Sequence, residues 1–424
     1  MNRFCLIALA IFVGYSAGCA PQFSAPPPIP ATTIAGSFTP ALTPIIAAQN
    51  PRITTPLPHQ TLPAPAAPVT LTLWTIEEWT SPSTPAGRIW QEQQNAFRTS
   101  QPEIALNVAL KKPAGKGGLY DFLATTFDIV PARLPDIIML DFAELAFAAD
   151  ARLIPPLGEN LAALPTDLFP FALQGARVKD QTYGVPFSAD VQHGIALTAA
   201  PRTWDEFLRQ KSPLIAPVGG DDAFVLQYLG VGAAFDNDGI DVNAAAQVLD
   251  FFKRARDAGL LPDSTLAMKT EDESSSAFFN AQAGLAHISA ARFMNERAKL
   301  PAARFAALPT RDGRLAARAS GWAIAIVTTD PARRRAAARW IEFVMQKDRL
   351  SAWMRAAQRV PTTRGALELA IEPPDYSAFL RNLLERASVV HLSPKQADAW
   401  RAAMSAVLRG QSTPTDAARI MAQR

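Results

Sequence analysis

The stretch Val69-Thr70-Leu71-Thr72-Leu73-Trp74 decides the fold, because it is a β-rich run at the start of a regular alternation of elements. A helix is predicted next, over Ala86–Phe97, with Ile89, Trp90 and Phe97 on one face. The sequence then predicts a strand over Ile104–Leu110, a helix over Tyr120–Phe127 and a strand over Asp136–Leu140. This order predicts a parallel sheet with covered faces, and therefore an α/β fold.

Three later helices carry terminal signals. Thr203 and Glu206 have the spacing of a capping box, and Gly259 follows an apolar stripe that runs from Ala245 to Ala255. Asp330-Pro331 places a proline at the first helical position, with Trp340 on the inward face. The region from Val69 to Arg424 is too long for one compact core, so two lobes are expected.

Composition excludes several classes of function for this region. The net charge of the chain is +3 with no basic block, so nucleic acid is not expected as a partner. The two cysteines, Cys5 and Cys19, precede it, which excludes disulfides and thiolate sites within it. His193, His287 and His391 have no second ligand at metal spacing, and no nucleophile elbow or phosphate loop is present. We therefore expect no catalytic residues, no metal and no cofactor.

The first residues read as an export signal. Residues 1–18 have a positive start, an apolar run too short for a membrane anchor and a small-residue end, which predicts a signal peptide. The residues before Cys19 resemble the lipobox of bacterial lipoproteins, apart from Ser16, where Leu is usual. That resemblance implies acylation of Cys19. An ordinary signal peptide with an incidental cysteine is the alternative.

A proline-rich segment follows. Between Ala20 and Pro68 lie 13 of the 36 prolines, and Arg52 is the only formally charged residue. Such a composition favours extended, unfolded chain. Residues 19–68 are therefore expected to be a disordered tether between a membrane lipid and the folded region, although a plain cell-wall spacer would look the same.

The order of several short motifs resembles the bacterial extracellular solute-binding proteins of family 1, which include maltose-binding protein. These motifs are the opening strand 71–74, Leu134–Ile138 leading to Asp141, Ala151–Leu157, Tyr183–Phe187, Pro201–Phe207, Ala283–Ile288 and Val360–Thr363. Each is weak alone, and the order is the specific signal. One departure is that residues 194–197 run almost directly into Ala200-Pro201, so the family's contacts from the missing stretch cannot be carried over.

The resemblance implies a two-lobe, type II periplasmic-binding-protein fold with three crossings, near 187–191, 288–291 and 320–322. Lobe 1 would comprise residues 69–189 and 290–321, and lobe 2 residues 190–289 and 322–424. Ligand would lie in the cleft, at the carboxyl ends of strands. Trp90, Trp340 and Trp353 lie on helical stripes and are expected in the core, and Trp204 is expected to pack locally.

Residues after strands or at crossings are the candidate ligand contacts. The aromatic candidates, which suit the apolar face of a sugar, are Trp74, Trp79, Phe224, Phe293 and Trp322. The polar candidates are Glu77, Asp141, Asp190, Asp236 and Arg292. Structural roles compete: Asp141 could cap a helix, and Asp236 could serve the turn after it. A buried Arg292 would also suit an anionic solute such as a sugar phosphate or glycerol phosphate.

The implied function is that of a solute receptor for an ABC importer. It would be a monomer, anchored by lipid on the extracellular side of the cell membrane, that closes its lobes on a mono- or oligosaccharide and delivers it to a permease. The alternatives are a surface sensor or structural lipoprotein without transport, and a secreted glycan-degrading enzyme with paired cleft acids.

Overall fold

The structure is a computed structural model that describes residues 68–158, 165–235, 239–281 and 284–423. The expected signal peptide, Cys19, the tether apart from Pro68, and Asp236 lie outside these residues. No helix of the described part is long and apolar enough to cross a membrane.

One large sheet organises the described residues. The strands are β1 (Val69–Ile76), β2 (Ile104–Lys111), β3 (Ile137–Asp141), β4 (Arg177–Val178), β5 (Gln181–Thr182), β6 (Gly184–Ala196), β7 (Leu214–Ile215), β8 (Leu285–Ser289), β9 (Arg304–Ala306), β10 (Ala317–Ile326), β11 (Val360–Pro361) and β12 (Ala387–Ser388). All but β4 and β5 belong to the large sheet, whose main order is β2-β1-β3-β10-β6-β8-β7, and β4 and β5 pair with each other in a separate sheet. As predicted, β1 is parallel to β2 and to β3. The strand β10 is antiparallel to both β3 and β6, so the sheet is mixed.

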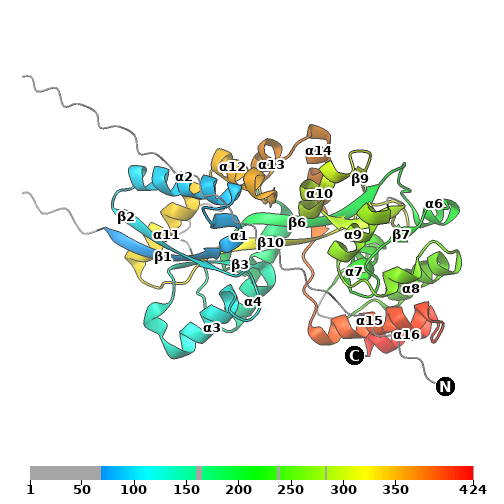
Figure 1. The fold of residues 1–424 in the computed structure, drawn as a ribbon. Coiled ribbons are helices and arrows are strands. Elements are labelled where there is room, and N and C mark those ends of the chain that lie inside the picture. Colours follow the sequence, from blue (N-terminus) through cyan, green and yellow to red (C-terminus); the bar gives the residue numbers. More distant parts are fainter. Residues whose placement is uncertain (1–67, 159–164, 236–238, 282–283, 424) are drawn as a thin grey trace, which may run out of the picture. The chain divides into compact units, whose positions relative to one another are not determined.

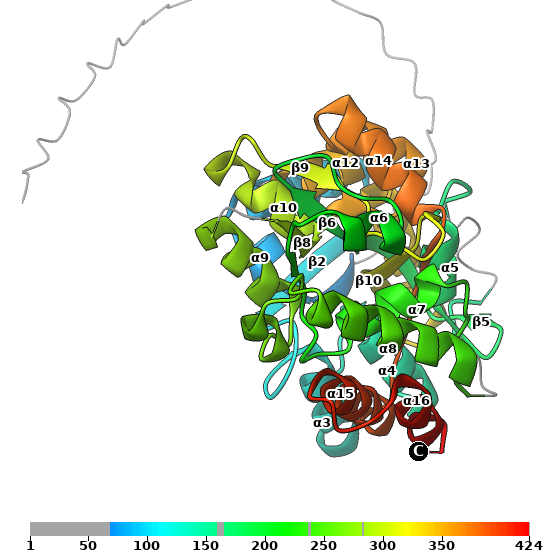
Figure 2. The same ribbon diagram turned by 90° about the vertical axis from the view of Figure 1, so that its right-hand side faces the viewer.

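Helices flank this sheet (Figures 1 and 2). They are α1 (Glu77–Thr80), α2 (Pro85–Ser100), α3 (Leu119–Ile129), α4 (Phe142–Asp150), α5 (Pro170–Gly175), α6 (Trp204–Arg209), α7 (Asp222–Gly230), α8 (Val242–Asp257), α9 (Glu271–Ala281), α10 (Ala290–Glu296), α11 (Pro331–Val344), α12 (Lys347–Ala357), α13 (Arg364–Ala370), α14 (Pro374–Leu384), α15 (Pro394–Leu408) and α16 (Pro414–Ala422). In Figure 1, α2 and α12 lie on one side of β1–β3, and α3 and α4 on the other. The predicted capping box opens α6, and Pro331 opens α11.

The buried side chains form two core clusters. The first contains the side chains of β1, β2 and β3, with Trp90, Trp340 and Trp353 fully buried in contact with one another, as expected of core residues. The second contains those of α7, α8, α15 and α16, together with Trp204, which stacks on Phe251. The two-lobe α/β fold is confirmed.

The chain passes between the clusters at several points, two of them inside strands. In β6, Ile195 belongs to the first cluster and Ala196 to the second, and in β8 the chain returns between Leu285 and Ala286. The predicted crossings near 187–191 and 288–291 fall on β6 and at the end of β8, whereas the one near 320–322 falls on β10, whose buried side chains all belong to the first cluster. The clusters change before β10, between Leu308 of the second and Ala317 of the first. A further passage, which the sequence reading did not include, separates Val389 of the first cluster from Val390 of the second.

The packing differs from the expected lobe boundary at residue 322. The sequence reading places residues 322–424 in lobe 2, yet the buried side chains of α11–α14 pack in the first cluster. The reason is that β10 runs antiparallel beside β3 and returns the chain to the first part of the sheet. Within that region, only residues from Val390 onward join the second cluster. The division into lobes stays a prediction, with this packing favouring a boundary near residue 390.

Candidate ligand-binding site

Two small cavities adjoin where the elements of the two core clusters meet. One, of about 250 Å³, is lined by Asp141, Phe142, Ala143, Arg318, Ala319, Ser320, Gly321, Trp322, Val389, Val390 and His391. The other, of about 180 Å³, is lined by Asp190, Gln192, Asp222, Glu271, Ser289, Arg318 and Ser320. We call them the aromatic cavity and the acidic cavity. Arg318 and Ser320 border both, so the two form one continuous site.

A third cavity extends this site into the second cluster. It has about 460 Å³ and shares Val389, Val390 and His391 with the aromatic cavity, and Trp400 and Phe235 are among its other lining residues. The three cavities therefore form a row from the acidic cavity past Trp322 to Trp400.

Arg318 is the central cation of the site. Its guanidinium pairs with Asp222 and, at 3.2 Å, with the adjacent Asp221. It also donates to the carbonyl of Val390. Because β10 supplies Arg318 and α7 begins at Asp222, this cluster joins an element of the first core to one of the second.

The carboxyl groups around Arg318 titrate differently. Burial opposes ionisation of Asp222, but the Arg318 charge and the hydrogen bonds from Gln192 and Glu271 together outweigh it and hold the pKa of Asp222 below its usual value. Glu271 bonds to Asp222, and burial together with the Asp222 charge raises the pKa of Glu271 to about 8. Of this bonded pair, Asp222 is therefore ionised and Glu271 protonated at neutral pH. Beside them, burial lowers the pKa of His287 to about 4, so its imidazole is neutral.

Asp190 lies at the first crossing, as expected for a candidate contact. Its Oδ1 atom accepts hydrogen bonds from the amides of Val191 and Ala291, each at 3.0 Å. Arg359 lies 3.8 Å from its other carboxylate oxygen and also pairs with Glu78 of α1. Burial nevertheless dominates and raises the pKa of Asp190.

Two of the predicted tryptophans meet beside Arg359. The rings of Trp79 and Trp322 pack edge to face with centroids 5.4 Å apart, and the Arg359 guanidinium lies 5.0 Å from the Trp79 ring centroid. Trp79 is buried behind Trp322, which is partly exposed and lines the aromatic cavity. Of the two, Trp322 is thus the ring available to a ligand, and Trp79, which Arg359 contacts, packs behind it.

Asp141 combines the two roles considered for it. It caps α4 by accepting from the amide of Glu144 at 2.7 Å, and it also lines the aromatic cavity opposite His391. Burial raises the pKa of Asp141. Burial and the Asp141 charge raise the pKa of Glu144 to about 8, and the Oε2 atom of Glu144 is buried without a hydrogen-bond partner.

The other described candidates are not brought to these cavities. Phe224 is fully buried between Tyr228 and Trp400, and Phe293 packs on His193 and Tyr376. The remaining three lie elsewhere: Trp74 packs on Phe122 beneath Lys111, Glu77 is exposed at the start of α1, and Arg292 forms ion pairs with Asp272 and Glu296.

Several site residues were not among the predicted contacts: Arg318, Arg359, Asp222, Glu271, His391 and Trp400. Sequence signals existed for two of them. Arg359 directly precedes the Val360–Thr363 motif, and Arg318 lies two residues before the crossing at Ser320. Glu271 and Trp400 lie on helices that only the tertiary fold brings to the site.

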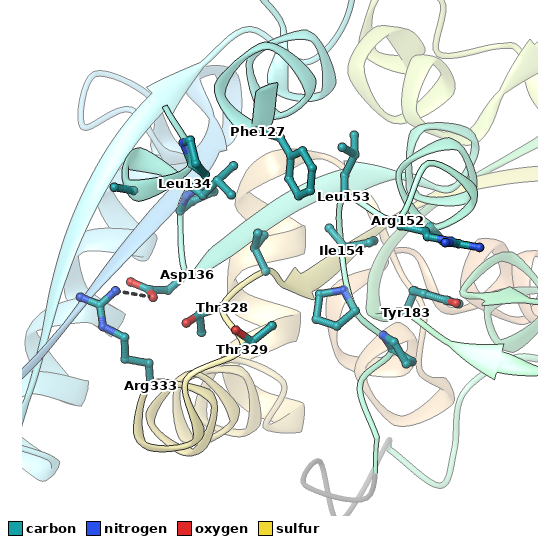
Figure 3. A pocket seen from close by; sticks show the side chains of 17 residues that line it. Phe127, Leu134, Asp136, Arg152, Leu153, Ile154, Tyr183, Thr328, Thr329 and Arg333 are labelled. Carbon is teal, nitrogen blue, oxygen red and sulfur yellow. Dashed lines mark hydrogen bonds and ion pairs between the residues drawn. The ribbon is translucent and has the colours of Figure 1, made fainter. Parts of the chain in front are cut away.

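A fourth cavity, larger than these three, lies at the start of β3 (Figure 3). It has about 600 Å³ and is lined mainly by apolar side chains such as Phe127, Leu134 and Ile154. Its buried carboxylate, Asp136, pairs with Arg333 at 2.8 Å and accepts from the Thr72 amide. That carboxylate is therefore already partnered on both oxygens.

Comparison with known proteins agrees with this architecture. Residues 129–379 match the family described as bacterial extracellular solute-binding protein, and the chain belongs to that family. No curated protein matches significantly in sequence.

Solved structures share the fold at low identity. The sugar-binding protein MalE from Xanthomonas citri is 18% identical, with a TM-score of 0.68 over 84% of this chain and 96% of that one. A cyclic alpha-maltosyl-1,6-maltose binding protein from Arthrobacter globiformis is 17% identical, with a TM-score of 0.67 over 84% and 98%. An ABC transporter solute-binding protein from Thermotoga lettingae, bound with alpha-D-tagatose, is 18% identical, with a TM-score of 0.61 over 84% and 98%.

Proposed function

We propose that this chain is the solute-binding component of an ABC importer and that its solute is a carbohydrate of one or more units. The observation that carries the proposal is the row of cavities at Arg318, where the Trp322 ring adjoins carboxylates and hydroxyls. An aromatic ring suits the C–H face of a sugar, and carboxylates accept from its hydroxyls. The sugar ligands named for the relatives from Arthrobacter and Thermotoga support the same class.

The charges of the site favour a neutral sugar over an anionic solute. Arg292, the residue that suggested an anion, is paired with acids away from the cavities. Arg318 and Arg359 border the site, but each already contacts two carboxylates. An incoming phosphate would therefore have to compete with resident carboxylates for both guanidinium groups.

A ligand screen tests the proposal directly. Residues 68–424 would be screened by thermal shift against mono- and oligosaccharides and their phosphates, with hits measured by calorimetric titration. We expect a neutral sugar to raise the melting temperature by mass action, with no hydrolysis of the bound sugar. Binding of sugar phosphates alone would favour the anionic alternative, and cleavage of the sugar would contradict a pure binding role.

Two further parts of the proposal concern the cell. A lipid on Cys19 would tether the protein to the membrane through residues 20–68, so Cys19→Ala should release it from the membrane fraction. Uptake of the sugar should fail in cells that lack the chain. Uptake that continues unchanged would favour a sensor without transport, an alternative that the shortened segment before Pro201 keeps open.

A further inference from the structure

The acidic cavity contains more hydrogen-bond acceptors than free donors. Asp190, Asp222 and Glu271 supply carboxyl oxygens, and Gln192 supplies an amide. The guanidinium of Arg318, the one cationic group in this lining, is already committed to Asp221, Asp222 and the Val390 carbonyl. A ligand group that enters this cavity must therefore be rich in donors.

The ion pairs leave one acid without a cation. Arg359 lies beside Asp190. Arg318 pairs with Asp221 and Asp222, and Arg401 lies 3.5 Å from Asp221. Within the described residues, no Lys or Arg nitrogen lies within 4.0 Å of Glu271, whose carboxyl group bonds instead to Asp222. Two carboxyl groups therefore share a buried position that a further positive charge would stabilise.

Two buried atoms near these acids have no hydrogen-bond partner. One is Oε1 of Gln192, which lines the cavity, and the other is Nε2 of His287, whose residue is 1% exposed. His287 lies two residues before Ser289 on β8, so both side chains leave the strand on the same face, and Ser289 lines the cavity. The electrostatic coupling of His287 to Asp222 and Arg318 places it at the same cluster. Buried polar atoms without partners are uncommon and point to a missing ligand group.

We propose that the acidic cavity receives a protonated amine of the solute, so that the preferred carbohydrates are amino sugars. This inference rests on the proposed sugar-binding function. An ammonium group has three donors and no acceptor, which matches the carboxyl oxygens and the free Gln192 oxygen. It also supplies the cation that Glu271 lacks.

The protonation state of Glu271 provides a second test of the proposal. Asp190, Asp222, His287 and Arg318 are the titratable or charged groups that surround it, and its pKa is raised to about 8 in the free protein. An ammonium group would favour the ionised carboxylate and release its proton. Calorimetry at pH 7 should therefore show an enthalpy that depends on the ionisation enthalpy of the buffer when the ligand carries an amine.

The experiment compares sugars that differ only in one substituent. Affinities for glucose and glucosamine, galactose and galactosamine, and cellobiose and its monoamino analogue would be measured for residues 68–424 at pH 7. We expect the amine of the preferred pair to bind at least about tenfold more tightly, about 1.4 kcal/mol. Glu271→Gln should reduce that ratio toward one, whereas Asp272→Asn, an exposed neighbour on α9, should leave it unchanged.

The outcomes separate the two proposals. Equal or weaker binding of the amines, with neutral sugars bound, would overturn the amine inference and leave the sugar-binding function standing. A preference for amines that persists in Glu271→Gln and in Asp222→Asn would overturn the assignment to this cavity. If no sugar of either kind bound, both proposals would fail.

Discussion

Trp322 has one face in the core and one in the site. Its edge packs against Trp79, which in turn contacts Phe187. Its exposed part lines the aromatic cavity next to Ser320 and Gly321. Because Trp322 contacts both the cavity and the core, its truncation should lower both the affinity for sugar and the free energy of unfolding.

We expect Trp322→Ala to weaken sugar binding by about 1–3 kcal/mol, as for an aromatic residue at a binding hot spot. Its cost in unfolding free energy should be below the about 3–5 kcal/mol typical of a fully buried tryptophan. Trp340→Ala is the matched control, because Trp340 is 0% exposed and distant from the site in the packing. Calorimetric titration and urea unfolding would measure both effects. A Trp322 variant with full affinity would remove this residue from the site.

Glu144 should make stability depend on pH. Its pKa is about 8 in the folded protein against an ordinary 4.5, so between these values the folded state holds a proton that the unfolded chain has lost. The unfolding free energy should therefore fall as pH rises from about 4.5 to 8. Glu144→Gln should reduce this fall, which would not vanish because Glu271 acts in the same direction.

The control for this pH series is Glu342→Gln, since Glu342 is exposed on α11. Urea midpoints at pH 5, 6, 7 and 8 would be compared for the three proteins. An unchanged slope in Glu144→Gln would show that the Glu144 carboxyl is solvated and ionised in the folded protein.

A site residue could be predicted when the sequence around it marked its position, and could not when only a distant partner defined its role. Asp190 and Trp322 were candidates because the family resemblance implies crossings near them, and both border the cavities at Arg318. Arg318 and Arg359 were missed because their roles come from partners far away in sequence, Asp222 and Asp190 respectively. Phe224 is buried against Trp400, and the sequence does not distinguish this position from one facing a cleft, because both place an aromatic residue on an apolar helix.

Among the elements, β10 positions most of the site. It supplies Arg318, Ser320 and Trp322, and its pairing with β6 shifts register between Trp322 and Ala323. Gly321 allows the close approach at this point, because a Cβ atom there would lie 2.5 Å from the Phe142 ring and 2.8 Å from the Ser188 carbonyl oxygen. Both neighbours belong to packed elements and cannot yield without moving the strand.

We therefore expect Gly321→Ala to lower the unfolding free energy by about 1–3 kcal/mol, as overpacking does, and to weaken sugar binding by moving Trp322. Gly365→Ala is the control, since its nearest neighbours would be the Asp167 and Lys347 side chains, at 3.1 and 3.3 Å, which can shift. Melting temperature and affinity would be measured for both. Equal stability of the two variants would contradict the close approach at Gly321.

The first elements of the fold were predictable because they carry their own periodicity. The predicted strand over Ile104–Leu110 and helix over Ala86–Phe97 match β2 and α2 to within a few residues at either end. The position of β10 was not predictable in the same way. A run of alanine and isoleucine predicts a buried strand, but its direction and neighbours depend on pairing with β3 and β6, and this pairing places α11–α14 in the first core.

At the scale of the whole molecule, the two cores share continuous strands. Ile195 and Ala196 are adjacent residues of β6 in different clusters, and the same holds for Leu285 and Ala286 in β8. A strand that loses its pairing on one side of such a point also loses the register that holds the other side. The two clusters should therefore unfold together rather than one after the other.

Labels on each cluster test this coupling. The form that starts at Pro68 has no cysteine, so single fluorophores can be placed through Glu92→Cys on α2 and Gln411→Cys between α15 and α16, both exposed sites. We expect both labels to report the same urea midpoint and a bound sugar to raise the two midpoints equally, because the ligand stabilises one cooperative unit. Two separate midpoints, or a ligand shift confined to one label, would mean that each core unfolds on its own and that β6 and β8 transmit no stability between them.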